Sequence, residues 1–298
     1  MTHRKIYLAG VSALALALPA AGYANENTLV IMTEGDNSLY VDQSGIGNTI
    51  GTAGGDTTTA DLAAWDFSSA RQTGFNNAAG IMQQGDYNQV LFQQGPESAI
   101  DGEEAMDNTL QVEQNGFDNT VSVFQDNTFN FAEIYQYDDN NTIAVSQTGD
   151  SNQAHADQGG TGNVAEVTQD GGHTVWLSQY GQDSYVGIDQ VGYNSGSAST
   201  ASYYGDGINN FAYIYQEADG GAGGHTADVN QYGGDNSAHV YQREFGNNAT
   251  LHQNGDMNYA FVDQSGTGNF AEVNQDGYGN IATVAQLGDG GHITILQN

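Results

Sequence analysis

The chain has no cysteine, and only 2 of its 298 residues are proline. Disulfide bonds are therefore excluded, and stability has to come from backbone pairing and from burial. Lys and Arg together number 4 against 36 Asp and Glu, which gives a formal net charge of −32 at pH 7. So few basic groups cannot form the clustered cationic surface that binds phosphate backbones or anionic lipid headgroups. We therefore expect no nucleic acid as a partner and no electrostatic docking to membranes.

Long hydrophobic runs are also missing, because none approaches the roughly 20 residues that cross a bilayer as a helix. The apolar run 6–18 follows two basic residues, Arg4 and Lys5, and precedes small residues at 22–24. This order is typical of a secretion signal, which we predict at 1–24. Its removal leaves two basic against 36 acidic residues, a formal charge of −34. The sequence thus predicts an exported, secreted protein with no membrane insertion.

What the chain has instead is a period of eleven residues. Glutamine recurs at this spacing, and asparagine follows most of these glutamines five residues later. A fixed short period indicates one small structural unit stacked on copies of itself. The glutamines are Gln114, Gln125, Gln136, Gln147, Gln158, Gln169, Gln231, Gln242, Gln253, Gln264, Gln275, Gln286 and Gln297, and the asparagines are Asn119, Asn130, Asn141, Asn152, Asn163, Asn236, Asn247, Asn258, Asn269 and Asn280.

Each unit alternates between two kinds of residue, as in the series Asn163, Ala165, Val167 and Gln169 with variable residues between them. Alternation at period two predicts a strand with one buried face. Four residues follow each Gln, and the second is commonly glycine, which tolerates the positive φ of a tight turn. These turn glycines include Gly116, Gly149, Gly160, Gly255, Gly266 and Gly277.

The expected fold is all-β: a β-solenoid of 22-residue strand–turn–strand rungs, each made of two 11-residue units. Rungs would stack in parallel and in register at about 4.8 Å, as in amyloid, with the inward Asn and Gln amides hydrogen-bonded along the stack. Unpaired, these amides would be costly in a dry interior. We predict this repeat solenoid over 72–298 and degenerate repeats over 25–71, with a non-repeat excursion at 49–71.

Three intervals depart from the period. The spacings from Gln190 to the Gly205 position and from Gln216 to Gln231 are each 15 residues, which predicts four-residue turn expansions around 195–201 and 218–226. The spacing from Gln169 to Gln179 is 10 residues, so one turn or strand there is shortened.

Catalysis finds no support, because the chain has no nucleophile–base set and no phosphate-binding loop. We therefore expect no enzyme, no cofactor and no dedicated metal site. Two features could bind metal ions. Histidines follow Gly-Gly pairs, and we interpret them as turn residues. Several turns are acidic, and we interpret them as a solvated surface because calcium-binding repeats have a period of nine residues rather than eleven. The histidines are His173, His225 and His292 at turns and His155, His239 and His252 at outward strand positions; the acidic turns include 138–139, 149–150 and 233–235.

Aromatic residues recur at outward strand positions. They could form stripes for adhesion or lateral packing, or they could stack across strands and steady the sheet. They are Phe131, Tyr135, Phe211, Tyr213, Tyr215, Tyr259, Phe261 and Phe270.

The string Asn141-x5-Gln147-x-Gly149-x-x-Asn152-x-Ala154-x3-Gln158 resembles the curlin repeat, and four further copies of its core begin at Gln158, Gln253, Gln264 and Gln275. The likeness covers roughly 72–298, with Asn at the position where that family usually has Ser. It implies a subunit of curli-like fibres on bacterial surfaces. It also implies other curlin-like subunits and an outer-membrane secretion pore as partners.

The last unit, 292–298, stops on an expected strand with no polar cap, so its edge offers the same backbone groups as an internal rung. We therefore expect a structural subunit that binds further copies of itself and polymerises end to end into functional amyloid, for biofilm matrix and cell adhesion. The alternative is a monomeric extracellular β-solenoid that acts as a carbohydrate or cation adhesin. A stable discrete monomer would favour the alternative.

Overall fold

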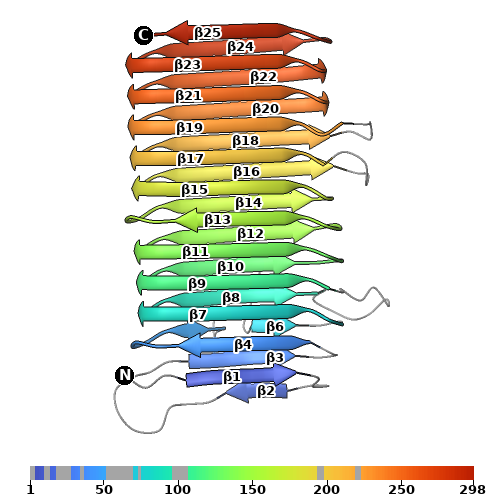
Figure 1. Ribbon diagram of the computed structural model, residues 1–298, viewed down its shortest axis with the longest axis vertical. Coiled ribbons are helices and arrows are strands. Elements are labelled where there is room, and N and C mark those ends of the chain that lie inside the picture. The colour runs from blue at the N-terminus through green and yellow to red at the C-terminus, as the bar shows by residue number, and fades with distance from the viewer. Residues whose placement is uncertain are drawn as a thin grey trace. The chain divides into compact units, whose positions relative to one another are not determined.

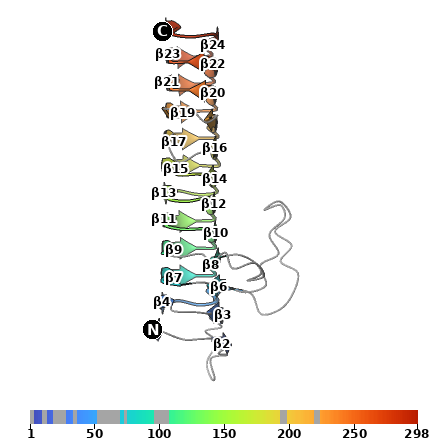
Figure 2. The same cartoon turned by 90° about the vertical axis from the view of Figure 1, so that its right-hand side faces the viewer.

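The computed structural model describes residues 4–9, 14–17, 28–33, 37–51, 70–72, 75–95, 107–192, 198–218 and 223–298. All regular structure in these residues is β, with no helix. Successive strands alternate between two sheets, as Figures 1 and 2 show, which confirms the expected β-solenoid. The chain divides into two compact units, 1–149 and 150–298, each described by itself.

Unit 1 contains twelve strands in the described residues. One sheet has the order β1-β4-β7-β9-β11 and the other β2-β3-β5-β8-β10-β12, with β6 beside β3 and β8. The first two strands pair antiparallel with β4 and β3, and the remaining pairs are parallel. The bounds are β1 (Arg4–Ala9), β2 (Leu14–Ala17), β3 (Thr28–Thr33), β4 (Ser38–Gln43), β5 (Thr49–Ile50), β6 (Ala70–Gln72), β7 (Ala78–Asp86), β8 (Gln89–Gln94), β9 (Thr109–Phe117), β10 (Thr120–Gln125), β11 (Phe131–Asp139) and β12 (Thr142–Thr148).

Unit 2 contains thirteen strands in its described residues, and neighbouring strands of each sheet pair in parallel. One sheet has the order β13-β15-β17-β19-β21-β23-β25 and the other β14-β16-β18-β20-β22-β24. The bounds are β13 (Gln153–Gln158), β14 (Val164–Asp170), β15 (Thr174–Gln182), β16 (Tyr185–Gly192), β17 (Thr200–Ile208), β18 (Phe211–Ala218), β19 (Thr226–Gly234), β20 (Ser237–Phe245), β21 (Asn248–Asp256), β22 (Tyr259–Thr267), β23 (Phe270–Tyr278), β24 (Ile281–Leu287) and β25 (His292–Gln297).

The register places like residues on like residues. Between β21 and β23, for example, Ala249 faces Ala271 and Gln253 faces Gln275. The inward residues of β4 to β24 are buried, and the small Ala position is commonly followed two residues later by a larger aliphatic one, such as Leu251. Side chains of both sheets therefore fill a thin core between two layers of strands.

Each turn uses two left-handed residues. Gly255 has φ +110° in the predicted glycine position, and Met257, directly before Asn258, has φ 59°. A Cβ built on Gly255 would lie 2.1 Å from the carbonyl oxygen of Gly277 in the next rung, so stacking itself excludes a side chain there. The second left-handed position was not predicted, because its occupant varies between Asp, Asn, Ser, Gly, Met, Tyr and Phe.

The irregular intervals have structural counterparts. Gln190 bonds to Gln216 and lies 26 residues before it, whereas most rungs are 22 residues long, as between Gln231 and Gln253. The four extra residues fall between Gln190 and Ser199, in agreement with a turn expansion, although 193–197 and 219–222 lie outside the described residues. The shortened interval is a three-residue turn, 170–172, between Gln169 and His173.

The excursion interrupts a strand rather than a turn. Asn48, Ile50, Ala70 and Gln72 are all fully buried, and Ile50 and Gln72 face Val90 and Gln94 of β8. β5 and β6 are thus the two halves of one unit, and 52–69 lies outside the described residues. The residues at the two ends of the predicted excursion at 49–71 are therefore part of the solenoid, in β5 and β6. The predicted signal at 1–24 includes β1 and β2, and its removal stays a prediction.

Candidate functional site: the inward amide columns

The inward glutamines form a hydrogen-bonded column, here called the Gln column. Gln253 Nε2 donates to Gln275 Oε1 at 2.9 Å and to the carbonyl oxygen of Ser237 at 3.1 Å, while Gln253 Oε1 accepts from Gln231 Nε2 at 2.9 Å. Its side chain is fully buried with both amide ends bonded, which removes the desolvation cost of a buried polar group. The same step joins Gln114 to Gln136, Gln125 to Gln147, Gln158 to Gln179, Gln169 to Gln190, Gln242 to Gln264, Gln264 to Gln286 and Gln275 to Gln297.

The inward asparagines form a second kind of column, the Asn column, at the start of each strand. Asn258 accepts a bond on Oδ1 from the backbone N–H of Asn280 at 3.0 Å, and its Nδ2 donates to the carbonyl of Gly277 at 3.1 Å. Each Asn therefore ties its own rung to the backbone of the next one. The same bond is accepted by Asn119, Asn236, Asn247 and Asn269 from the backbone N–H groups of Asn141, Asn258, Asn269 and Gly291, and by Asn152 and Asn163 from those of His173 and Ser184. The backbone N–H of Asn130 donates in the same way to Asn108 Oδ1.

Comparison with known families agrees with this geometry. Three segments, 139–171, 246–277 and 266–298, match the curlin-associated repeat. The protein carries curlin-associated repeats. A search of curated proteins found no match to the chain. Together the curlin-associated repeats and the β-solenoid suggest a curli-type structural subunit.

Two histidines take the place of asparagine in the Asn column. His173 and His225 are buried in the Asn column, where the sequence interpretation as turn residues was wrong. His173 Nδ1 accepts the backbone N–H of Ser199 at 3.1 Å, and its Nε2 lies 3.0 Å from the carbonyl oxygen of Asp170. Since an acceptor Nδ1 is unprotonated, Nε2 carries the proton and donates to that carbonyl. Burial lowers the pKa of His173.

His225 repeats this arrangement. Its Nδ1 accepts from the backbone N–H of Asn247 at 3.3 Å, and Nε2 donates to the carbonyl of Glu217 at 2.9 Å. Burial lowers its pKa as well. The spacing in the sequence could have located both histidines. The Asn-column residue precedes the inward Gln of its own strand by six residues, and His173 precedes Gln179, and His225 precedes Gln231, by the same distance. His292 follows a glycine, Gly291, which takes the column position instead.

The Gln column of unit 2 is interrupted once within its described residues. In β17 the column position is Gly205, and the preceding inward residue is the fully buried Tyr203. The Tyr203 hydroxyl donates to Gln231 Oε1 at 3.0 Å, taking over the bond that a glutamine would make. Gln179 Nε2, which faces this rung, is buried without a hydrogen-bond partner.

The outward aromatics stack across strands. In unit 2 they gather on the sheet of β16, β18, β20 and β22, where Tyr185 and Phe211 lie 5.3 Å apart and Tyr241 and Phe261 lie 5.6 Å apart between ring centroids. On the other sheet Phe270 stacks on His292 at 4.6 Å. In unit 1, a bond of 2.7 Å from Tyr135 to Glu133 raises the pKa of Tyr135 to about 12. These contacts agree with cross-strand stacking as the local role of the aromatics.

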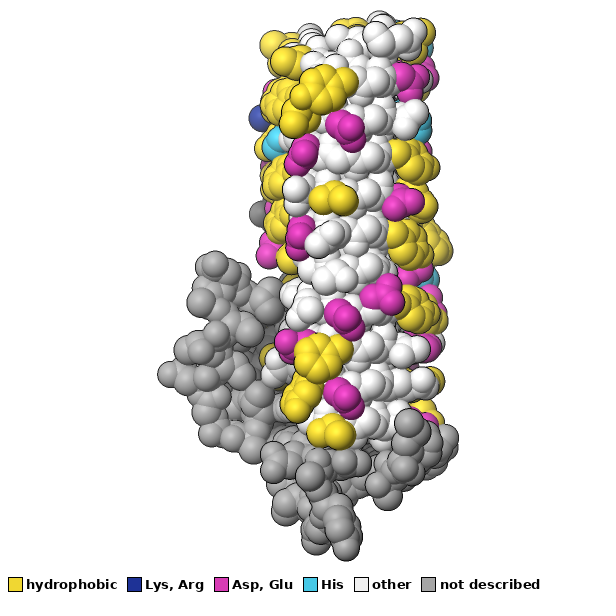
Figure 3. Space-filling view, turned by 90° about the vertical axis from the view of Figure 1, so that its left-hand side faces the viewer, with side chains coloured by type: hydrophobic (Ala, Val, Ile, Leu, Met, Phe, Trp, Pro, Cys, Tyr) yellow, Lys and Arg dark blue, Asp and Glu magenta, His cyan; other side chains and the backbone are white. Residues whose placement is uncertain are grey.

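Carboxylates at the turns bond to neighbouring turns. Asp256 Oδ1 accepts from the backbone N–H of Gly234 at 2.8 Å, and Asp289 Oδ1 accepts from Thr267 in the same way. Acidic side chains recur along the surface in Figure 3. Within the described ranges, no group of three or more His, Cys, Asp and Glu is arranged to hold a metal ion. No helix in the part that the structure describes is long and apolar enough to span a membrane.

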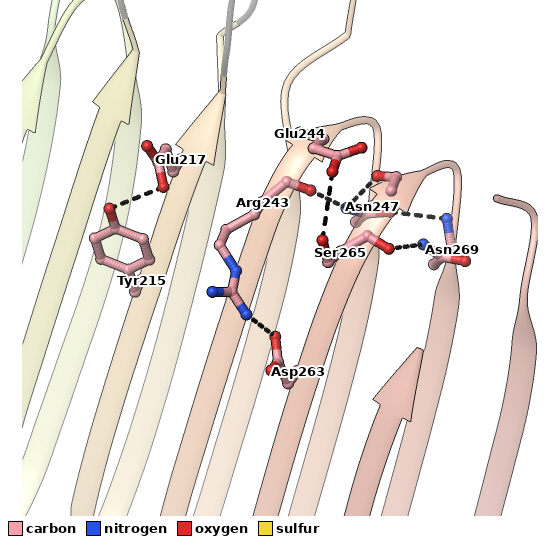
Figure 4. A network of polar contacts seen from close by, with 9 residues as sticks. Tyr215, Glu217, Arg243, Glu244, Asn247, Asp263, Ser265 and Asn269 are labelled. Carbon is pink, nitrogen blue, oxygen red and sulfur yellow. Dashed lines mark hydrogen bonds and ion pairs between the residues drawn. The ribbon is translucent and has the colours of Figure 1, made fainter. Parts of the chain in front are cut away.

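Arg243 and Glu244 lie at the end of β20, where Glu244 has the left-handed φ of 74° that belongs to the turn. Arg243 Nη2 is 2.6 Å from Asp263 Oδ1 on the next strand of the same sheet, as Figure 4 shows. This ion pair raises the pKa of the guanidinium. Both partners are partly exposed, so the pair stabilises the fold only modestly.

Proposed function

We propose that the protein is a secreted fibre subunit that polymerises end to end into curli-like functional amyloid, with a role in biofilm matrix and cell adhesion. The observation that carries the proposal is the repetition of one interface. Apart from the rungs with Gly205, His173 and His225, the described rungs of the repeat bond to the next through the same backbone pairs, the same Gln-to-Gln bond and the same Asn-to-backbone bond. A second copy that adds a rung makes no new kind of contact.

The last rung, β24 and β25, supports this proposal. Each strand pairs with one neighbour among the described strands, β22 and β23 respectively. Such an edge presents unpaired N–H and C=O groups to any strand of matching register. The inward Ile293 and Ile295 are half-buried here, whereas the equivalent Ala271 and Val273 of the preceding strand are buried. Another copy would cover them.

Charge opposes this assembly. Identical rungs place their carboxylates close to one another, well within a Debye length of about 8 Å. Protonation of carboxylates removes this repulsion, so assembly should accelerate towards the sequence pI of 4.1. Equal assembly rates at pH 7 and pH 4 would exclude charge repulsion as the limiting factor.

The curlin repeats favour an extracellular location on the bacterial surface. They also favour an outer-membrane pore and other curlin-like subunits as partners. These partners are inferred from the family and need direct tests, such as secretion assays in cells that lack the pore.

The edge can be blocked selectively. In this sheet the outward residues direct their N–H groups to the following rung, as Phe270 N–H bonds to Gly291 O. By the same alternation, the N–H of Thr294 in β25 points away from β23 and has no partner strand among the described residues. Thr294→Pro therefore removes a docking donor without removing a hydrogen bond within the chain. Thr294→Ala is the matched control.

The experiment measures thioflavin fluorescence and filaments by electron microscopy for the mature chain and both variants. We expect filaments from the wild type and Thr294→Ala, and a long delay for Thr294→Pro. Persistent monomers of the wild type after seeding would refute the proposal and favour the monomeric adhesin. Equal assembly of all three would show that β25 is not the docking edge.

A further inference from the structure

One outward face of unit 2 differs from the other. The sheet of β16, β18, β20 and β22 carries an aromatic face, defined by Tyr185, Phe211, Tyr213, Tyr215, Tyr241 and Phe261. Their rings contact one another across strands, with Tyr213 and Tyr241 5.8 Å apart. The opposite sheet carries a smaller set of ring contacts, between Tyr180, Tyr204 and Tyr232. Its other outward positions in β19 and β21 hold mostly polar residues such as Thr226, Asn230 and Thr250.

Carboxylates are set among these rings. Tyr185 donates to Glu166 at 2.8 Å, and burial together with the nearby Glu217 raises the pKa of Tyr215 to about 12. Asp189 lies opposite Tyr215 in the register. It has no hydrogen-bond or ion-pair partner among the described residues, and burial raises its pKa. An unpaired carboxylate in this setting gains from a bound cation.

The face already holds one guanidinium. Arg243 bonds to Asp263, with Glu217 beside it in the register and Tyr215 nearby, as Figure 4 shows. Asp263 and Asp189 lie at the two ends of one column of outward residues, with Tyr215 and Tyr241 between them.

The two ends of this column differ. Arg243, which pairs with Asp263, lies on the preceding strand of the sheet, two residues after Tyr241, the register partner of Asp263. The residue in the equivalent position for Asp189 is Asp170 of β14. Asp263 is thus paired with the chain's own arginine, whereas the equivalent position beside Asp189 holds an acid, and the tyrosine next to Asp189 lies on the following strand rather than the preceding one.

We propose that the aromatic face binds an extended, arginine-bearing peptide segment, with one guanidinium on Asp189 as Arg243 sits on Asp263. Guanidinium groups stack on tyrosine rings and pair with carboxylates, so this surface offers both contacts that arginine prefers. The formal charge of −32 attracts a cationic partner and opposes a second copy of this chain on the same face. The proposal does not depend on polymerisation.

The test uses fluorescence anisotropy of a labelled peptide of alternating Arg and Thr, with alternating Lys and Thr for comparison. Asp189→Asn should weaken binding of the Arg peptide about tenfold, the equivalent of one charge-assisted contact. Glu272→Gln, on the outward side of β23 in the opposite sheet, changes the net charge equally and should leave affinity unchanged. Equal losses in both variants would mean diffuse attraction to a polyanion and would overturn the proposal.

A second variant predicts a gain. Arg243→Gln releases Asp263 and should tighten binding or add a second peptide per chain. Thr250→Asp adds the same negative charge on the opposite sheet and should not. Equal gains from both variants, or equal affinities for the Arg and Lys peptides, would contradict recognition of guanidinium by this face.

Discussion

Tyr203 occupies the space that any side chain at residue 205 would need, because a Cβ built on Gly205 would lie 2.0 Å from the Tyr203 hydroxyl oxygen. The two residues are therefore one compensated substitution. A tyrosine replaces the aliphatic residue of the core, reaches past a glycine that replaces glutamine, and bonds to Gln231 at 3.0 Å. The neighbour on the other side, Gln179, is left with an unpaired amide.

This coupling predicts a non-additive pair of substitutions. Gly205→Gln alone should destabilise the fold by about 3 kcal/mol through overpacking, and Tyr203→Val alone by a similar amount through a cavity. The double variant restores the sequence pattern of the other repeats and should be at least as stable as the wild type, since Gln179 regains an acceptor. Urea unfolding of the four proteins gives the coupling energy. Additive effects would show that the two positions are independent.

The buried histidines predict acid sensitivity. The folded state lowers the pKa of His173 and His225 below the ordinary value of about 6.5. The unfolded chain therefore binds these protons first, and their stabilising contribution is present above about pH 6.5 and is lost as pH falls towards the folded-state pKa. Protonation of Nδ1 also replaces an acceptor by a donor that faces a backbone N–H.

The double variant His173→Asn/His225→Asn should flatten this dependence. The measurement is the urea midpoint at pH 7.5 and pH 5.5. His155→Asn/His252→Asn changes two outward histidines and should keep the loss seen in the wild type. An unchanged pH dependence in the first variant would contradict the role assigned to the buried pair.

Alanine substitutions at two turn glycines distinguish a steric clash with the next rung from the backbone strain of a positive φ. Gly255→Ala should cost about 3 kcal/mol or more, because the new Cβ meets the carbonyl of Gly277 and φ is +110°. Gly268→Ala should cost only about 1 kcal/mol, because φ is +67° and no atom lies within 4 Å of the new Cβ. Thermal unfolding compares the two. Equal losses would mean that stacking of the turns does not select glycine.

The Gln column predicts a large cost for removing one amide. Gln253→Leu leaves Gln275 Oε1 without its donor and Gln231 with one bond fewer. The expected loss of unfolding free energy is about 2–4 kcal/mol. Gln153→Leu, at an exposed outward position of β13, should change stability by less than about 0.5 kcal/mol. Similarly small losses of unfolding free energy in both variants would show that the Gln column contributes little to stability.

The period of the sequence was sufficient to predict strands, their register and the inward positions of Gln and Asn. This succeeds because a solenoid repeats one local solution, so a position such as Gln253 has the same neighbours in every rung. The expansion before Ser199 was predicted for the same reason, since stacking forces the period to resume.

The departures were harder, because they depend on contacts between rungs rather than on local pattern. Tyr203 compensates for Gly205 through a hydroxyl that reaches the next rung, and nothing in either residue alone indicates this. His173 keeps the bonding pattern of asparagine with a different side chain. The strand that joins Ile50 to Ala70 is split by an insertion that hides its alternation.

The one-way orientation of the amides has a consequence for any array built from this chain. Every glutamine step described above runs from an N–H in one rung to an oxygen in the rung with higher residue numbers, so a copy added upside down would set donor against donor. Subunits joined by this chemistry must all face the same way, and the two tips of the resulting filament are chemically distinct. A binder selective for one tip would therefore label filaments at a single end.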